Sequence, residues 1–202
     1  MAISLTSMTI AAVGDRPRLQ SIRRTAAQAR ILAAALELFA QHGVSGTSLQ
    51  MIADEIGVTK AAVYHQYRTK DEIVLAVAES EFVALEAALE AAEAEKSREQ
   101  ARKLLLKQVI STAVERRPWV RSLQNDPVMI RLLAGHEPLT DIMARIYGLL
   151  LDDTGPQANV RIAIMGATIG ATVVHPLVAD LDNQTLEREL LRVAKRVFDI
   201  SL

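Results

Sequence analysis

The stretch VTKAAVYHQYRTK, residues 58–70, concentrates side chains that could bind a polyanion. It holds two of the three tyrosines in a chain of 202 residues, Tyr64 and Tyr67, together with Lys60, Arg68 and Lys70 and no acid. Lysine, tyrosine and backbone N–H groups all donate hydrogen bonds to phosphate oxygens, and helix N-termini favour anions. The composition of the stretch is therefore that of a nucleic-acid contact.

The charges of the chain are divided unevenly around this stretch. Residues 16–70 hold eight Lys or Arg and three acids, an excess of five positive charges, whereas residues 71–202 hold fifteen Lys or Arg and twenty acids. A basic segment in a chain of net charge −1 suggests that this segment meets a polyanion. The excess is small and solvated charged faces are common, so charge supports the motif but does not establish it.

Helical periodicity dominates the chain, and two short helices are predicted to present the basic stretch. A longer helix precedes them from Arg24 to His42, with Gly43 as its stop. Thr47 has the position of a cap for the next helix, and Gln50 three residues later completes the spacing of a capping box.

A tight turn joins the second helix to the third. Gly57 can take a left-handed conformation and end the second helix, and Thr59 can cap a third helix that runs to about His65. Two short helices on a glycine turn, braced by a longer helix before them, describe a helix-turn-helix. The pattern alone also occurs in helical proteins that do not bind DNA.

The third helix has one face suited to the major groove. Residues three and four apart share a helix face, which places Lys60, Ala61, Tyr64 and His65 together and Val63 on the opposite side. The small Ala61 permits close approach, and polar side chains near the helix N-terminus can reach base edges.

The remaining candidate contacts lie at helix starts. Lys70 begins the fourth helix, where a lysine and the helix N-terminus could hold one phosphate together, and Thr47 and Ser48 have the same position on the second helix. Tyr67 is predicted to be a core residue that braces the small domain on the fourth helix. The predicted DNA-binding residues are Thr47, Ser48, Thr59, Lys60, Ala61, Tyr64, His65 and Lys70.

The segment from Arg24 to about Glu79 resembles the DNA-binding domain of the TetR family of bacterial transcriptional regulators. The run ILAAALELFAQHGVSGTSLQMIADEIGVTKAAVYHQYRTKDEIVLAV carries the resemblance. The run contains a helix that ends in Phe39 and then His42-Gly43. Thr47-Ser48 follows ahead of Ile52-Ala53, and the turn Gly-Val-Thr-Lys comes next, at residues 57–60. Tyr64, a second aromatic three residues later and a Lys three residues after that complete the motif. Val63 replaces the commoner leucine, and Ala61-Ala62 stands where glycine or serine is frequent.

This resemblance implies specific roles in the basic stretch. It places Lys60, Tyr64 and Lys70 at positions that contact the DNA backbone, and Thr59 to Ala61 with His65 in or near the groove. It covers about a quarter of the chain, and the helical remainder has a suitable length.

Residues 71–202 are predicted to form a larger helical domain. Thr69 with Glu72 would open a fourth helix to about Glu95, Ser97 with Gln100 would open a fifth to about Arg117, and Pro118 either breaks that helix or begins the next. Further helices are expected near residues 128–134, 139–152, 158–179 and 184–200. We predict an all-α fold with a disordered N-terminal tail (1–22), a helix-turn-helix DNA-binding domain (23–70), and a helical ligand-binding and dimerisation domain (71–202).

The TetR resemblance also implies a homodimer through the last two helices, bound to a palindromic operator on double-stranded DNA. Small residues recur along one flank of the penultimate helix, at Ala163, Gly166, Ala167, Gly170 and Ala171. They suit a close contact with a second copy, with burial inside the same subunit as the alternative. The last helix carries a heptad-like stripe of Leu186, Leu190, Val193, Val197 and Ile200.

The family places an effector among its fourth to eighth helices, and an effector that favours a splayed dimer would release the DNA. The effector is expected to be apolar or amphipathic. The predicted ligand-binding residues are Trp119, Met129, Met143, Tyr147, Met165 and Thr172, with Asn125, Thr168 and His175 as further polar options. Ordinary core packing is the alternative for each of them.

Other classes of protein find little support in the sequence. The chain has no cysteine, its His136 and His175 lack metal-ligand spacing, and no nucleophile lies beside a base, so no metal, cofactor or catalysis is expected. No run of transmembrane length is seen, and a cytoplasmic protein is expected. The favoured function is a homodimeric, ligand-responsive repressor. The alternatives are a helical small-molecule carrier or enzyme with a structural helix-turn-helix, and an activator or nucleoid protein.

Overall fold

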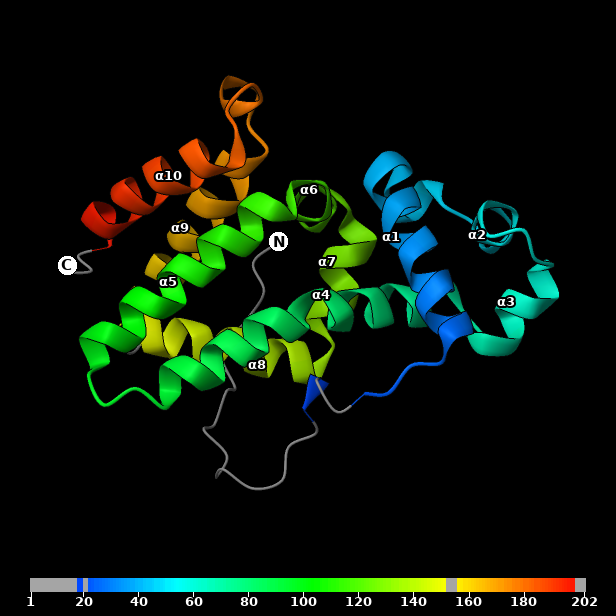
Figure 1. Cartoon of the computed structure of the whole chain (residues 1–202), viewed down its shortest axis with the longest axis horizontal. Helices are drawn as coiled ribbons and strands as arrows, with labels where there is room; N and C mark the ends of the chain where they lie inside the picture. The colour runs from blue at the N-terminus through cyan, green and yellow to red at the C-terminus, as the bar shows by residue number, and fades with distance from the viewer. Residues whose placement is uncertain (1–17, 20–21, 152–155, 199–202) are drawn as a thin grey trace.

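The computed structural model describes residues 18–19, 22–151 and 156–198, which form α-helices and no strand (Figure 1). This confirms the predicted all-α class. In chain order the helices are α1 (Ala26–Gly46), α2 (Leu49–Glu55), α3 (Lys60–Gln66), α4 (Lys70–Glu93), α5 (Arg98–Glu115), α6 (Arg117–Asn125), α7 (Pro127–Ala134), α8 (Glu137–Leu150), α9 (Pro156–Val173), the 3-10 turn η2 (Pro176–Val178) and α10 (Asn183–Val197).

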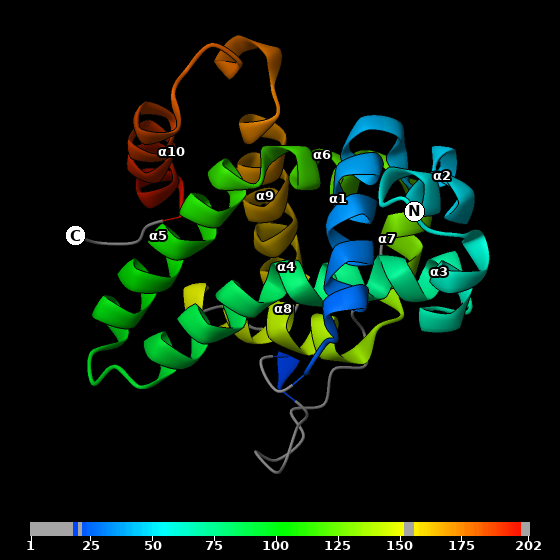
Figure 2. The ribbon, with the colours of Figure 1, turned by 45° about the vertical axis from the view of Figure 1, so that its right-hand side comes forward.

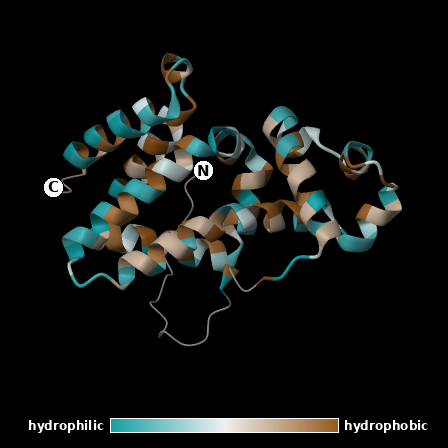
Figure 3. Cartoon of the chain, viewed as in Figure 1, coloured by the Kyte–Doolittle hydropathy of each residue, from teal (hydrophilic) through white to brown (hydrophobic). Residues whose placement is uncertain are grey.

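Helices α1 to α3 lie at one end of the molecule, and α9 and α10 lie toward the other (Figures 1 and 2). The long helix α4 belongs to both parts, since it packs on α1 and also on α5 and α8. Hydrophobic and hydrophilic bands alternate along the helices (Figure 3) because each helix buries only one of its faces. Phe39, Ile52 and Val63 are fully buried at the centre of the first three helices.

Most helix starts follow the local signals in the sequence. The Oγ1 atoms of Thr59 and Thr69 accept hydrogen bonds from the backbone N–H of Ala62 (3.2 Å) and Glu72 (3.1 Å), and Ser97 caps α5 in the same way. Each cap satisfies a backbone donor that the first turn leaves without an intrahelical partner. These three predicted caps are confirmed.

The predicted cap of α2 is wrong by one residue. Ser48 is the cap, and its Oγ accepts from the N–H of Met51 at 3.2 Å. Thr47 instead closes the end of α1, where its hydroxyl donates to the carbonyl oxygens of Gly43 (2.8 Å) and Leu38 (3.3 Å). Gln50 makes no capping box, because its amide donates to the Asp54 carboxylate at 2.7 Å.

Prolines mark two helix boundaries in the second half of the chain. Of the two alternatives for Pro118, the structure confirms the second, because Pro118 lies in the first turn of the separate helix α6. The helix expected over residues 158–179 ends at Val173, and the 3-10 turn η2 follows it. Pro176 has no N–H to donate, and it holds His175 in an extended conformation, so the α-helix cannot continue through that point.

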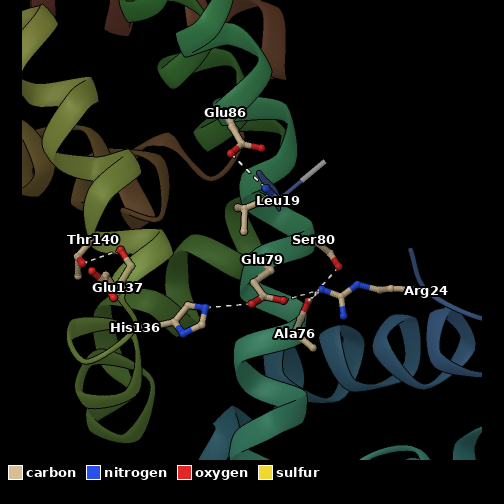
Figure 4. A network of polar contacts seen from close by, with 9 residues as sticks. All are labelled: Leu19, Arg24, Ala76, Glu79, Ser80, Glu86, His136, Glu137 and Thr140. Carbon is tan, nitrogen blue, oxygen red and sulfur yellow. Dashed lines mark hydrogen bonds and ion pairs between the residues drawn. The ribbon is translucent and has the colours of Figure 1, made fainter. Parts of the chain in front are cut away.

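Within the range predicted to be a disordered tail (1–22), the described residues 18–19 are docked on α4. Leu19 is 3% exposed, and its backbone N–H donates to the buried carboxylate of Glu86 on α4 at 3.2 Å (Figure 4). Arg18 forms an ion pair with Glu90, one turn further along the same helix. Burial of a leucine side chain contributes about 1.5–3 kcal/mol and so favours this docked position. Residues 1–17 and 20–21 of the predicted tail lie outside the described residues.

Gly43 and Gly57 both have a positive φ, at 71° and 69°. Alanine at Gly57 is expected to cost about 1–2 kcal/mol, because a built Cβ meets nothing within 4 Å and only the left-handed backbone is penalised. Alanine at Gly43 should cost more, since its Cβ would lie 3.2 Å from the Asp126 carboxylate. Urea unfolding of both variants measures the difference, and a Gly57→Ala variant at least as destabilised as Gly43→Ala would contradict this ranking.

Candidate nucleic-acid interface and effector domain

Helix α3 is held in place by its buried side and its preceding turn. Val63 is fully buried against α2, and the N–H of Val58 donates to the carbonyl of Ala53 at 2.9 Å across the turn that Gly57 makes. Thr59 then caps the helix. The opposite face of α3 is therefore fixed in direction and turned to the exterior.

The outward face carries the side chains that the sequence predicted for it. Lys60, Ala61, Tyr64 and His65 are all exposed, and Tyr64 retains 48% of its accessible surface. The guanidinium of Arg68 lies 5.4 Å from the centroid of the Tyr64 ring, within the range of a cation–π contact. The sequence-based reasoning did not include Arg68 in this face. Its position four residues after Tyr64 was the available signal.

Lys70 does not lie free beside α3. Its Nζ donates to the carbonyl oxygens of Val44 (2.7 Å) and Thr47 (2.9 Å), the backbone between α1 and α2. An ammonium bonded to two partly buried carbonyls stabilises this turn, which is a structural role for a residue predicted to contact phosphate. Thr47 is 2% exposed with its hydroxyl engaged, so its burial keeps the side chain from DNA. The predicted contact of Thr47 is therefore corrected, whereas Ser48 is exposed.

The structural role of Lys70 makes a stability prediction. Lys70→Met keeps the aliphatic stem and removes the ammonium, so the chain should lose about 1.5–3 kcal/mol of unfolding free energy. Lys107→Met on α5 removes an exposed lysine and serves as the matched control. Urea unfolding compares the two, and equal stability of both variants would contradict the role that we assign to Lys70.

Tyr67 is 7% exposed and packs in the core, and burial is the main cause that raises its pKa. Beside it, the carboxylate of Glu79 on α4 bonds on one side to Arg24 (2.8 Å) and on the other to His136 (3.0 Å) (Figure 4). Arg24 also donates to the carbonyl of Ala76. This polar network joins the segment before α1 to the start of α8 through α4.

The predicted ligand-binding residues come from helices α6 to α9 and lie within or against the hydrophobic core. Trp119, Met129 and Met165 are buried, and Met143 and Tyr147 are partly buried beside them. Burial raises the pKa of Tyr147. Thr168 and Thr172 are half-buried on α9. His175 is exposed, and its ring accepts from the N–H of Leu177, while the side chain of Asn125 lies outside the described residues.

An open depression of about 440 Å³ lies elsewhere, between α5 and α10. It contains none of the predicted ligand-binding residues. Its lining residues are Glu95, Gln100, Lys103, Leu104, Lys107, Leu191 and Lys195.

The glycines of α9 face the interior of the subunit, which corrects their predicted place at a dimer contact. A Cβ built on Gly170 would overlap the Gln124 side chain of α6, and one on Gly166 would lie 3.1 Å from the Tyr147 hydroxyl. The outward flank of α9 carries the alanines of the predicted stripe, Ala163, Ala167 and Ala171. Exposed large apolar side chains accompany them on the two last helices: Val160 (58%), Ile164 (48%), Val193 (49%) and Val197 (56%).

The described residues contain neither a cluster suited to a metal ion nor a helix suited to a membrane. No group of three or more His, Asp or Glu side chains within residues 18–19, 22–151 and 156–198 could hold a metal ion. In the same part of the chain, no helix has both the length and the apolar character that crossing a bilayer requires.

The first helices match a known family. The sequence model described as "Bacterial regulatory proteins, tetR family" matches residues 31–77. The HTH-type transcriptional regulator SrpR of Pseudomonas putida is 47% identical over 60 residues, a segment that covers 27% of this chain. That segment covers only 28% of SrpR, so this relative is matched over about a quarter of its length.

The fold of most of the chain is shared with solved structures. The SmeT–triclosan complex superposes with a TM-score of 0.63 at 22% identity and covers 86% of this chain and 91% of SmeT. FadR of Bacillus subtilis in complex with stearoyl-CoA gives a TM-score of 0.61 at 16% identity, over 82% of this chain and 96% of FadR. Residues 31–77 thus match the model of the TetR family of bacterial regulatory proteins, and the helical fold is shared with solved structures of low sequence identity.

Proposed function

We propose that the protein is a sequence-specific DNA-binding regulator of transcription, acting in the cytoplasm, where α1 to α3 form the DNA-binding unit and α4 to α10 the effector and dimerisation unit. The observation that carries this proposal is the outward face of α3. Lys60 and Tyr64 there offer donors to the phosphate backbone, and Ala61 lets the helix approach the groove while His65 reaches toward base edges. Thr59 at the tip and Ser48 at the start of α2 complete the proposed interface.

We further propose that two copies join through α9 and α10. Val160, Ile164, Val193 and Val197 expose apolar surface on these helices, and burial of such surface drives association. A two-fold dimer would place its two α3 helices about 34 Å apart, one turn of DNA, and would therefore read an inverted repeat.

The proposed effector is a small apolar or amphipathic molecule that binds among α6 to α9. The buried Trp119, Met129 and Met165 supply an apolar lining, and Tyr147 and Thr172 supply hydroxyls. The solved relatives in complex with triclosan and with stearoyl-CoA support a ligand of this character. An effector that binds more tightly to a dimer with splayed DNA-binding units would increase the population of that arrangement. The DNA would then be released. We therefore favour a repressor.

Selection of bound fragments from genomic DNA tests the proposal. We expect enrichment of a short palindrome, and addition of the enriched DNA should protect the α3 amides from hydrogen exchange. A chain that enriches no sequence would contradict the proposal and favour a helical carrier. Enrichment without sequence preference would favour a nucleoid protein.

A further inference from the structure

The carboxylate of Asp126 lies between the two parts of the chain, at the junction of α6 and α7. Its Oδ1 accepts from the N–H of Val128 (2.9 Å) and Met129 (3.3 Å) and so caps α7. Its Oδ2 accepts from the N–H of Val44 (2.7 Å) and Ser45 (3.1 Å), which belong to the end of α1. One side chain therefore caps an effector-domain helix and binds the backbone that leads into α2.

The contact is built into the interior rather than formed on the surface. Asp126 is 7% exposed. Burial tends to raise the pKa of its carboxyl, but the four backbone hydrogen bonds outweigh it and hold the pKa below its usual value. Gly43 leaves space for the carboxylate, since any Cβ there would lie 3.2 Å from Oδ2.

The backbone between α1 and α2 is hydrogen-bonded to Lys70 as well as to Asp126. The N–H of Val44 donates to Asp126, and its carbonyl oxygen accepts from Lys70. One turn before Asp126, the Oγ of Ser122 donates to the carbonyl of Phe39 on α1 at 3.0 Å, also in the interior. The backbone of residues 44–47 therefore has little freedom, and Ser48 begins α2 directly after it.

The other side of α6 and α7 faces the effector core. The Gln124 side chain packs at Gly170 of α9, and Trp119 and Met129 are buried among the proposed ligand-binding residues. We propose that Asp126 is the positioning residue that fixes the helix-turn-helix on the effector domain. Loss of its Oδ2 contacts would free the backbone before α2 from α6 and α7. This role does not depend on the proposed function.

Serine at this position separates the two roles of the carboxylate. Serine and aspartate are about equally good helix caps, so Asp126→Ser keeps the cap of α7, but its single short hydroxyl cannot also reach Val44 and Ser45. Asp182 is the matched control. It caps α10 through the N–H of Thr185 at 2.9 Å, so serine there also keeps a helix cap.

The full chain contains no cysteine, so two introduced cysteines can carry spin labels without further changes. Exposed positions suitable for them are Glu55 on α2 and Lys107 on α5. Dilution of labelled chains with excess unlabelled protein isolates the distance within one chain. We expect Asp126→Ser to broaden or shift this distance distribution and to speed hydrogen exchange of the Val44 and Ser45 amides at least about tenfold. Asp182→Ser should match the wild type in both measurements.

An Asp126→Ser variant with wild-type distances and wild-type exchange at Val44 and Ser45 would overturn the proposal, as would equal changes in Asp182→Ser. If the serine variant does not fold, Asp126→Asn, which keeps the size of the side chain, is judged by the same criteria. Fragment selection with the wild type is scored separately. A wild-type chain that selects no DNA would refute the proposed function, and the label distances would still decide the role of Asp126.

Discussion

The double substitution Ile164→Glu and Val197→Glu is expected to convert the proposed dimer to a monomer. Both side chains expose apolar surface on α9 and α10, at 48% and 56%. A carboxylate buried at the centre of a dimer contact without a partner would cost more than the contact gains. Sedimentation equilibrium should show half the wild-type mass.

The same variant should bind the selected palindrome at least about a hundredfold more weakly, because two linked modules gain about 10²–10⁴ in avidity over one. Leu104→Glu is the matched control, since Leu104 is an exposed apolar residue on α5, 41% exposed and outside the proposed contact. A double variant that sediments as a dimer would refute the α9 and α10 interface, and a monomeric Leu104→Glu variant would move the interface to α5.

Reversal of one charge on α3 is expected to have the second large effect. Lys60→Glu replaces a proposed phosphate contact with a repulsive group in both half-sites. A loss of about 1–3 kcal/mol in each of them would lower operator affinity at least about thirtyfold. Tyr64→Phe should give a smaller loss, because the ring keeps its contact with Arg68 and only the hydroxyl is removed. Fluorescence anisotropy with the selected fragment at fixed salt measures both affinities.

Lys107→Glu makes the same change in net charge on the exposed surface of α5, remote from α3, and should leave affinity within a few-fold of the wild type. Equal losses in Lys60→Glu and Lys107→Glu would show that only overall charge matters, and the recognition face assigned to α3 would then be wrong.

Much of the DNA-binding unit could be predicted because its determinants are local. Thr59 caps α3 through a donor three residues away, and Gly57 turns the chain by its own backbone freedom. Helix periodicity likewise separates the buried Val63 from the exposed Tyr64 without reference to the rest of the fold. The family resemblance added the identity of this unit, whereas the roles of its side chains at DNA remain predictions.

The sequence by itself therefore determined the helical class, most helix starts and the outward face of α3. Each of these depends on residues within about one helical turn. Only the tertiary structure decided which distant groups each polar side chain meets. Lys70 binds carbonyls 26 and 23 residues away, and Leu19 meets Glu86 across 67 residues. Asp126 reaches amides 82 and 81 residues earlier in the chain. These partners come together through the packing of whole helices. No local sequence pattern around Lys70, Leu19 or Asp126 encodes that packing.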